Sequence, residues 1–307
     1  MKINSIQELF EHASKNLFRP RIAVAAAEDL NALETVAEAR EMGWADAVLV
    51  GRKAEIEERA TELSIDISAF SIVEAADEIE AAEKAIEQIA MGKCEILMKG
   101  AVPTGTLMKK AVEKEYGLRT DRILSHVAVF DSPRENRLIF LTDAGINIAP
   151  DMARKRDIII NAVEVAHALG YDNPKVAALS YVEKKSNLKE RSVADAVLLT
   201  EMNRGGSIPG CVVDGPFALD NAVSEESAKI KGIGGEVAGK ADVLLAHDLH
   251  MGNAIYKALQ VWVGSVMAGV VVGSTMPIIL TSRADSKESK MHSLAFAKFL
   301  AGGGSNG

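Results

Sequence analysis

The chain has 307 residues, of which 48% are hydrophobic and 5% aromatic, and its 43 acidic and 35 basic side chains give a formal net charge of −8. A chain of this length can bury a large core in about two domains, so the composition excludes a disordered protein. The acidic excess excludes the broad positive field that binds DNA or RNA without sequence preference, and we expect no nucleic-acid partner.

The two cysteines, Cys94 and Cys211, lie far apart in the sequence, and neither has a Cys or His at metal-binding spacing. We therefore expect reduced thiols that serve as small core residues, in a cytoplasmic protein. The N-terminal segment has no apolar stretch of secretory length, and the spacing of Ile3, Ile6 and Leu9 predicts an amphipathic first helix instead.

Short apolar runs alternate with segments of helical period through the next part of the chain. The expected strands are 21–27, 47–50 and 95–99, and the expected helices are 29–42, with Asp29 as its N-cap, and 76–91. A loop at 100–105 then leads into a helix at Thr106. This alternation predicts a mostly parallel sheet with helices on both faces.

Two β-prone runs, 125–130 and 137–142, are joined by a polar turn and predict an antiparallel ribbon. The alternation then resumes, with helices expected at 151–169, 193–202 and 287–300 and strands at 175–180, 211–213 and 241–246. The predicted fold class is therefore α/β, with two three-layer αβα domains around a cleft. We expect the substrate site in that cleft, at the carboxyl ends of the strands.

The segment 261–280 is twenty residues without a formal charge, which is the length of a membrane-spanning helix. Gly264, Gly269 and Pro277 interrupt the run. We therefore expect a buried helix, a turn and a buried strand, and no membrane contact.

Two other patterns are incomplete. Residues 234–241 nearly form a phosphate loop, but Ala241 stands where a Ser or Thr would bind magnesium, and the segment precedes a strand instead of following one. His247 and His250 leave a metal site as an alternative, but two imidazoles three residues apart need a third ligand that no nearby motif supplies, so we expect no metal.

Polar side chains directly follow several of the predicted strands, where ligands bind to α/β sheets. Their hydroxyl, amide and cationic groups suit a small anionic ligand that carries phosphate. The expected binding residues are Lys99, Thr104, Thr106, Lys109, Lys110, Asp143, Asn147, Lys184, Asp248, Gly252 and Asn253.

A further polar group, Ser282, Arg283 and Asp285, follows the apolar run 277–280. An arginine fork beside a hydroxyl suits phosphate or a developing oxyanion. The alternative is an ordinary helix cap at Ser286 with a surface ion pair.

Four segments in chain order, 178–187, 213–224, 237–259 and 281–286, resemble the phosphate acetyl/butyryltransferase family, and the butyryl branch is the closer. The most specific part is the D-L-x-x-G-N-x-x-Y-K string at 248–257. The resemblance extends from about Ile96 to the final helix.

The resemblance implies a fold like that of the isocitrate and isopropylmalate dehydrogenases, in a homodimer or larger homo-oligomer. The first domain would comprise residues 1–132 and 281–301, the second 133–280, and 302–307 would form a flexible tail. The implied reaction joins acyl-CoA and phosphate reversibly into acyl phosphate and CoA, with coenzyme A as a substrate and no bound cofactor. Butyryl or branched-chain groups are the expected acyl groups; the alternatives are a phosphate acetyltransferase or a nicotinamide-dependent decarboxylating dehydrogenase of the same fold.

The resemblance also implies roles for individual residues. The family's Ser-Arg pair carries over to Ser282 and Arg283, and its basic residue near the helix after the fourth strand falls on either Lys109 or Lys110. The acetyltransferases place an Asp as the base for the CoA thiol near Ser289, which cannot act as a base. Either Asp285 takes this role, or the thiol loses its proton in another way.

Overall fold

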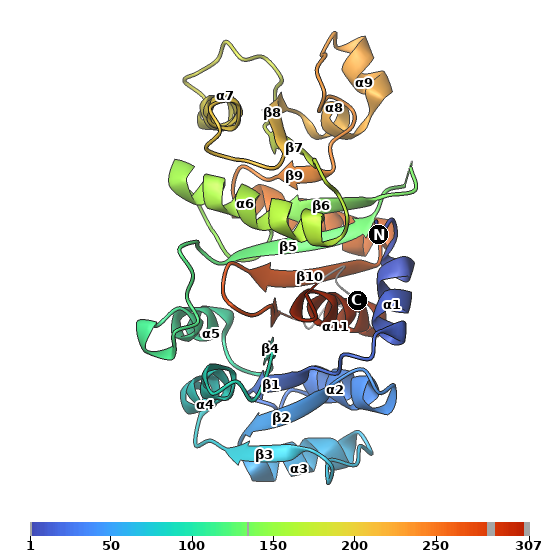
Figure 1. Ribbon diagram of the computed structural model, residues 1–307, viewed down its shortest axis with the longest axis vertical. Coiled ribbons are helices and arrows are strands. Elements are labelled where there is room, and N and C mark those ends of the chain that lie inside the picture. The colour runs from blue at the N-terminus through green and yellow to red at the C-terminus, as the bar shows by residue number, and fades with distance from the viewer. Residues whose placement is uncertain (1, 134, 281–285, 304–307) are drawn as a thin grey trace. The chain divides into compact units, whose positions relative to one another are not determined.

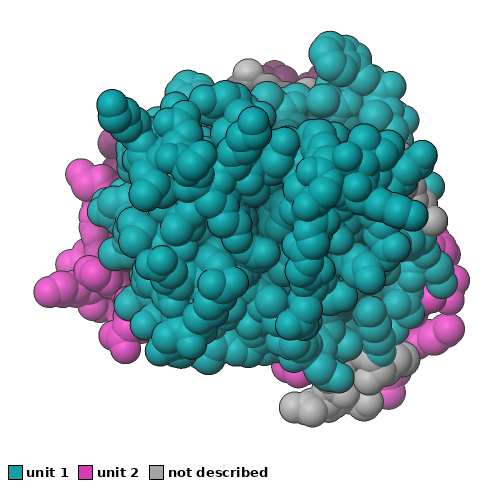
Figure 2. All heavy atoms as spheres, turned by 90° about the horizontal axis from the view of Figure 1, so that it is seen from above, with its two compact units in different colours: residues 1–6, 125–267 teal, residues 7–124, 268–307 magenta. Residues whose placement is uncertain are grey.

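The computed structural model describes residues 2–133, 135–280 and 286–303. The chain divides into two compact units, which Figure 2 shows in different colours. Unit 1 comprises residues 1–6 and 125–267, and unit 2 comprises residues 7–124 and 268–307. One unit boundary lies directly before β5 (Ser125–Asp131), which keeps the antiparallel pairing of β5 with β6 (Leu138–Thr142) inside one unit.

The strands of unit 2 are mostly parallel. β3 (Ser71–Glu74), β2 (Asp46–Gly51), β1 (Arg21–Ala25) and β4 (Ile96–Lys99) lie side by side in that order, followed by β11 (Ile278–Ile279), which is parallel to β4, and β10 (Met267–Val272), which is antiparallel to β11. The central strands are buried on both faces, which is why they consist almost wholly of apolar residues.

Helices cover both faces of these strands. One layer contains α2 (Leu30–Glu41), α3 (Lys53–Glu62) and α11 (Lys287–Ala301), and the other contains α4 (Glu78–Ala90) and α5 (Thr104–Ala111), which pack against each other. α1 (Ile6–Lys15) precedes the first strand, and the 3₁₀ turn η1 (Lys114–Tyr116) follows α5. The two layers follow from right-handed crossovers, since the chain moves outward from β1 to β3 and then returns to β4.

Unit 1 has the strand order β5-β6-β9-β7-β8, in which β9 is Val243–Leu245, β7 is Lys175–Leu179 and β8 is Val212–Phe217. Only β5 and β6 pair as an antiparallel hairpin, and the other neighbours are parallel. α6 (Met152–Ala168) and α7 (Arg191–Arg204) form one layer, and α8 (Leu219–Val223) and α9 (Glu225–Ile230) lie on the other side (Figure 1). α10 (Leu249–Lys257) packs against the same core cluster as α8 and α9.

The mixed α/β prediction is confirmed, and so are the antiparallel ribbon and the main helices. Asp29 caps α2 by accepting a hydrogen bond from the backbone N–H of Ala32, and Asp151 caps α6 through the N–H of Arg154. Most observed bounds lie within two residues of the predicted ones, as at α5, which begins at Thr104, and the largest difference is at β8, which continues to Phe217.

The interpretation of the uncharged segment 261–280 needs correction. A π-helix (Ala258–Val263) continues α10, and its last three residues are exposed: Val261 by 68%, Trp262 by 87% and Val263 by 66%. Leu259 packs against the core of unit 1, whereas Trp262 and Val263 line an apolar pocket on the same face. The turn ends at Gly264 with a left-handed φ of 71°. No helix in the described ranges is long and apolar enough to cross a membrane.

Candidate active site

At the carboxyl ends of the parallel strands of unit 2, the backbone after β4 passes very close to the backbone at the end of β1. Gly100 follows β4 directly and donates its N–H to the carbonyl of Ala25, and a Cβ added to Gly100 would lie 2.0 Å from the carbonyl oxygen of Ala26. Only glycine fits there. Lys99, which is half-buried, donates from Nζ to the carbonyl of Gly100 at 3.0 Å, so its ammonium is held at the carboxyl end of β4.

The four polar residues predicted on α5 lie at its two ends. Thr104 and Thr106 are half-buried in the first turn, and Lys109 and Lys110 are in the last turn. The Nζ of Lys110 lies 2.6 Å from Oε1 of Glu83 and 3.3 Å from Oε2 of Glu113. The hydrogen bonds to Glu83 and Glu113 raise the pKa of Lys110. Lys109 is exposed, so its charge is the more accessible of the two.

Glu28 is a further candidate site residue, and the sequence patterns do not single it out. It follows β1, and its side chain is 6% exposed, with Oε1 2.9 Å from Nη2 of Arg52. Its Oε2 is buried without a hydrogen-bond partner among the described residues, and burial raises the pKa of this carboxyl group. The charge pattern after β1 gave no sign of this burial, because Glu28 adjoins the helix cap Asp29 and looks like part of an exposed acidic pair.

In unit 1, Asp143 organises the turn that follows β6. Its buried carboxylate accepts hydrogen bonds from the backbone N–H groups of Gly145, Ile146 and Asn147 at 2.8, 2.9 and 3.2 Å, and from the Asn147 amide at 2.6 Å. Four donors on one carboxylate fix the loop. The structure thus brings Asp143 and Asn147 together, and both hold the backbone of this turn.

α10 begins beside the same turn. Asp248 caps the helix by accepting from the N–H of Met251 at 2.9 Å. Gly252 is buried, and a Cβ at this position would lie 2.1 Å from the carbonyl oxygen of Asp143. Asn253 is exposed, and its amide reaches the carbonyl of Ala144 at 3.4 Å. The D-L-x-x-G-N-x-x-Y-K string at 248–257 therefore packs the start of α10 against the turn after β6.

Lys184 lies apart from these groups, in the exposed loop between β7 and α7. Its neighbour Lys185 pairs with Asp214, with 2.9 Å between Nζ and Oδ1. Neither the turn after β6 nor the start of α10 makes a hydrogen bond to Lys184 in the described part of the chain.

A buried charged cluster lies at the carboxyl ends of β6, β7 and β9 in unit 1. Lys155 comes from the first turn of α6, Asp195 from the second turn of α7, and His247 from the loop after β9. The Nζ of Lys155, 1% exposed, lies 2.6 Å from Oδ2 of Asp195 and 2.8 Å from Nδ1 of His247. Nε of Arg191 is 3.6 Å from Oδ2 of Asp195.

Burial dominates the electrostatics of this cluster. It lowers the pKa of Lys155, while the contact with Asp195 acts in the opposite direction and favours the ammonium. Burial and the nearby ammonium of Lys155 both lower the pKa of His247. The cluster thus holds a carboxylate, Asp195, that is paired with both Lys155 and Arg191, and an imidazole that resists protonation.

From the sequence, His247 is interpreted as part of a hydrogen-bonded loop, with a metal site as the alternative, and Lys155 is not among the predicted site residues. The signal was present, since Lys155 lies on the same helical face as Ile158, Ile159 and Ala162, all of which are buried. A lysine on an apolar stripe predicts a buried charge with a partner. No three His, Cys, Asp or Glu side chains of the described residues lie close enough to hold a metal ion.

The predicted catalytic residues Ser282, Arg283 and Asp285 lie outside the described residues. The two cysteines are free and buried, and burial raises the pKa of Cys94 to about 12 and that of Cys211 to about 11. These thiols are poor nucleophiles, as expected of core residues.

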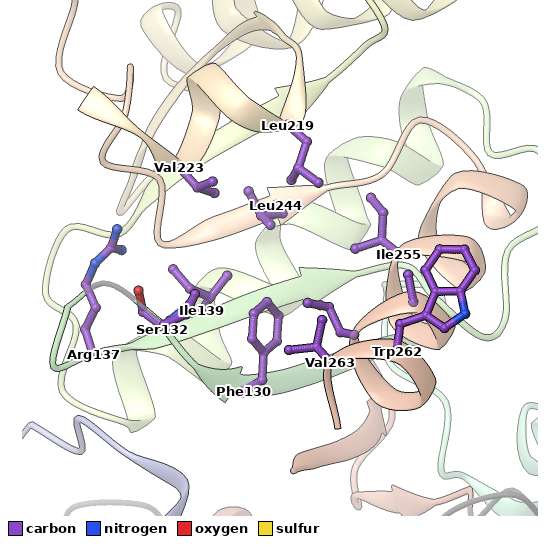
Figure 3. Close-up of a pocket in the computed structure, with 13 residues that line it drawn as sticks. Phe130, Ser132, Arg137, Ile139, Leu219, Val223, Leu244, Ile255, Trp262 and Val263 are labelled. Carbon is purple, nitrogen blue, oxygen red and sulfur yellow. The ribbon is translucent and has the colours of Figure 1, made fainter. Parts of the chain in front are cut away.

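An apolar pocket of about 270 Å³ lies on the α8 and α10 face of unit 1 (Figure 3). Phe130, Ile139 and Leu244 form its floor, and Trp262 stands at one end of it. Among the described lining residues, only Arg137 is charged, and it already donates to Asp242 and to the carbonyl of Ala241 at 2.8 and 2.9 Å. The lining suits an apolar group and offers no phosphate site.

The sequence matches the family described as phosphate acetyl/butaryl transferase over residues 5–90 and 78–298. It is 47% identical to a phosphate butyryltransferase of Clostridium acetobutylicum over 92% of this chain and 93% of the relative. It is 41% identical to a phosphate acetyltransferase of Thermotoga maritima, over 92% and 95%. A crystal structure of a branched-chain phosphotransacylase from Enterococcus faecalis is similar, with a TM-score of 0.80 and 33% identity over 92% of this chain and 99% of that one.

Proposed function

The chain belongs to the phosphate acetyl/butyryltransferase family, and on this premise we propose that it transfers a short acyl group reversibly between coenzyme A and inorganic phosphate. The observation that carries the proposal is the 47% identity to a phosphate butyryltransferase along nearly the whole of both chains. The protein is an acyltransferase, and coenzyme A is its substrate.

In the direction of acyl-CoA formation, the thiolate of CoA attacks the acyl phosphate carbonyl. The new C–S bond forms as the bond between the acyl carbon and the phosphate oxygen breaks, and inorganic phosphate leaves with the electron pair. Arg283 holds the departing phosphate or the developing oxyanion, and Ser282 donates a hydrogen bond to it. Asp285 takes the thiol proton.

The phosphate groups of CoA need accessible cations. We assign this role to Lys109 and Lys184, because both are exposed, and to Lys99, whose ammonium is held at the end of β4. Lys110 is a weaker choice, since Glu83 and Glu113 already neutralise it. The polar groups of Thr104 and Thr106 add hydroxyl donors at the start of the same helix. Asp143, Asn147, Asp248, Gly252 and Asn253 shape the loops around the ligand in unit 1.

Two measurements test this function. Release of free thiol from acyl-CoA in the presence of phosphate detects the reaction, and the same assay with acetyl, propionyl, butyryl and branched acyl groups gives the preferred chain. We expect butyryl or a branched group to give the highest kcat/KM, while a preference for acetyl would make the protein a phosphate acetyltransferase.

Loss of an oxyanion donor costs about 3–4 kcal/mol in the barrier, so Arg283→Ala should lower turnover at least a hundredfold. A rate near that of the wild type would remove Arg283 from the site.

We further propose that a second copy of the chain covers the apolar pocket of unit 1. Trp262 protrudes beside the pocket, so each copy offers both an apolar knob and an apolar hole, as a two-fold interface requires. An uncovered patch of this kind marks an interaction surface. Sedimentation should give a homodimer or larger assembly, which Trp262→Glu dissociates. The control Leu17→Glu, at a residue 98% exposed in unit 2, should leave the mass unchanged. An unchanged mass of Trp262→Glu would exclude this surface.

We also propose a more specific fold and a cellular compartment for the protein. The three-layer arrangement of each unit supports the plan of the isocitrate and isopropylmalate dehydrogenases. The buried free thiols of Cys94 and Cys211 support a reducing compartment, the cytoplasm.

A further inference from the structure

The buried cluster at the end of β9 has a definite hydrogen-bond direction. An ammonium group carries three donors and no acceptor, so Nζ of Lys155 must donate to Nδ1 of His247 across 2.8 Å. A neutral imidazole that accepts at Nδ1 carries its hydrogen at Nε2. The ring nitrogen that faces away from Lys155 is therefore a donor.

The groups around His247 come from three elements. Lys155 on α6 lies in contact, Oδ2 of Asp195 on α7 is 3.8 Å from Nδ1, Arg191 on α7 is paired with Asp195, and Asp248 follows His247 in its own loop. The two positive groups disfavour the imidazolium, and the carboxylate of Asp195 is already 2.6 Å from the ammonium. Burial adds to the effect, since the His247 side chain is 16% exposed.

The position of the ring favours a ligand contact. His247 follows β9 at the edge where the parallel strands of unit 1 end, and the next residue caps α10. The Nε2 atom has no hydrogen-bond partner in the described part of the chain, and it is not among the buried atoms that lack a partner. It therefore reaches the surface at this edge.

We propose that Lys155 holds His247 as the neutral tautomer protonated at Nε2, and that this N–H donates a hydrogen bond to an oxygen of the anionic substrate. Lys155 is then a positioning residue that acts through His247. The ligand class, an acyl phosphate or the phosphate from which it is made, rests on the proposed function. This donor is uncharged, so its hydrogen bond to the ligand does not require protonation of His247 to the imidazolium.

The first test measures the ring itself in the intact wild-type protein. Histidine labelled with ¹³C at Cε1 and with ¹⁵N reports both the tautomer and the titration, and the His247→Gln spectrum identifies the His247 resonance. We expect the Nε2–H tautomer and a titration midpoint below 6.5. An Nδ1–H tautomer, or a midpoint at or above 6.5, would overturn the role of Lys155.

The second test uses activity and a matched pair of variants. A glutamine side chain can accept from Lys155 with its oxygen and donate with its nitrogen, whereas alanine can do neither. We expect His247→Ala to lower kcat/KM for the acyl phosphate at least tenfold, and His247→Gln to recover most of that loss. Equal kcat/KM for wild type and His247→Ala would overturn the substrate contact.

The two tests separate the inference from the proposed function. If the wild-type protein transfers no acyl group to phosphate or CoA, the proposed function and its substrate contact fail together. The magnetic resonance result still decides whether Lys155 fixes the His247 tautomer. Lys155→Arg provides a check with a retained charge, because a guanidinium also donates and has no acceptor, and it should keep the low midpoint.

Discussion

Two lysines, one in each unit, show how differently the same side chain is used in this protein. Lys110 lies on the last turn of α5 in unit 2 with 22% of its side chain exposed, and two glutamates raise its pKa. Lys155 lies in the first turn of α6 in unit 1 with 1% exposed, and burial lowers its pKa. Lys110 pairs with residues of its own surface, whereas Lys155 joins three elements inside the unit. Position relative to the sheet, and not residue type, decides whether a cation is a surface charge or part of a buried network.

The largest expected effect is the difference in unfolding free energy lost when the charge of Lys155 or that of Lys110 is removed. Lys155→Met leaves Asp195 buried without its ammonium partner, and breaking a buried pair in this way costs about 3–5 kcal/mol in the free energy of unfolding. Lys110→Met leaves Glu83 and Glu113 in contact with water and should have a much smaller effect. Urea unfolding followed by circular dichroism measures both. Similar losses of unfolding free energy for the two variants would show that burial does not increase the contribution of the Lys155–Asp195 ion pair to stability.

A pair of helical glycines extends the comparison from charge to packing. The Cβ introduced by Gly252→Ala in α10 would lie 2.1 Å from the backbone oxygen of Asp143, so the helix must shift, at a cost of about 1–3 kcal/mol. Gly105 in α5 has no atom within 4 Å of the same position, and Gly105→Ala should stabilise by about 0.5–1 kcal/mol. The same unfolding experiment distinguishes them. A neutral Gly252→Ala would mean that α10 is free to move away from the β6 turn.

The pH dependence of stability that His247 contributes in unit 1 is a smaller effect. The pKa of His247 is lower in the folded protein than the ordinary value of 6.5, so the unfolded chain takes up a proton first as the pH falls. The contribution of His247 is therefore present above 6.5 and is lost as the pH falls below it, by up to about 1.4 kcal/mol per pH unit.

His247→Gln removes this titration, so its stability relative to the wild type should rise as the pH is lowered from 7.5 to 5.5. Unfolding free energies of both proteins at the two pH values measure the change. A constant difference would show that the pKa of His247 is the same in the folded and unfolded states.

The smallest expected effect concerns the thiols, which are alike in the two units. With pKa values of about 12 for Cys94 and about 11 for Cys211, only about one in ten thousand and one in a thousand of the thiols are ionised at pH 8. We expect no reaction of the folded protein with a chromogenic disulfide, and full reaction of both residues in denaturant. Rapid labelling of either thiol in the folded protein would identify a local opening of that unit.

The order of helices and strands follows from local patterns, so the sequence predicts it well. Apolar alternation gives the strands, a 3.6-residue period gives the helices, and side-chain oxygens such as those of Asp29 and Asp151 mark where helices begin. The four family segments are equally local, since each is a continuous string. The α/β class and the family therefore follow from the sequence alone.

The sequence misled where the outcome depends on what packs against a segment. The apolar run 261–263 predicts a buried segment, yet Trp262 is 87% exposed at the end of the π-helix. Polar residues after strands predict ligand contacts, but the carboxylate of Asp143 is used by its own turn. The hydrophobicity and charge of a side chain predict whether it favours burial or a polar partner. They do not predict which residue contacts it in the folded protein.

The sequence by itself determined the alternation of helices and strands, the helix caps and the family, because each depends on residues that are close along the chain. Only the tertiary structure brought Lys155, Asp195 and His247 to one point, or paired Lys110 with Glu83. These partners come from separate helices and strands, and their charges interact strongly only where folding has removed water and fixed the distances between them.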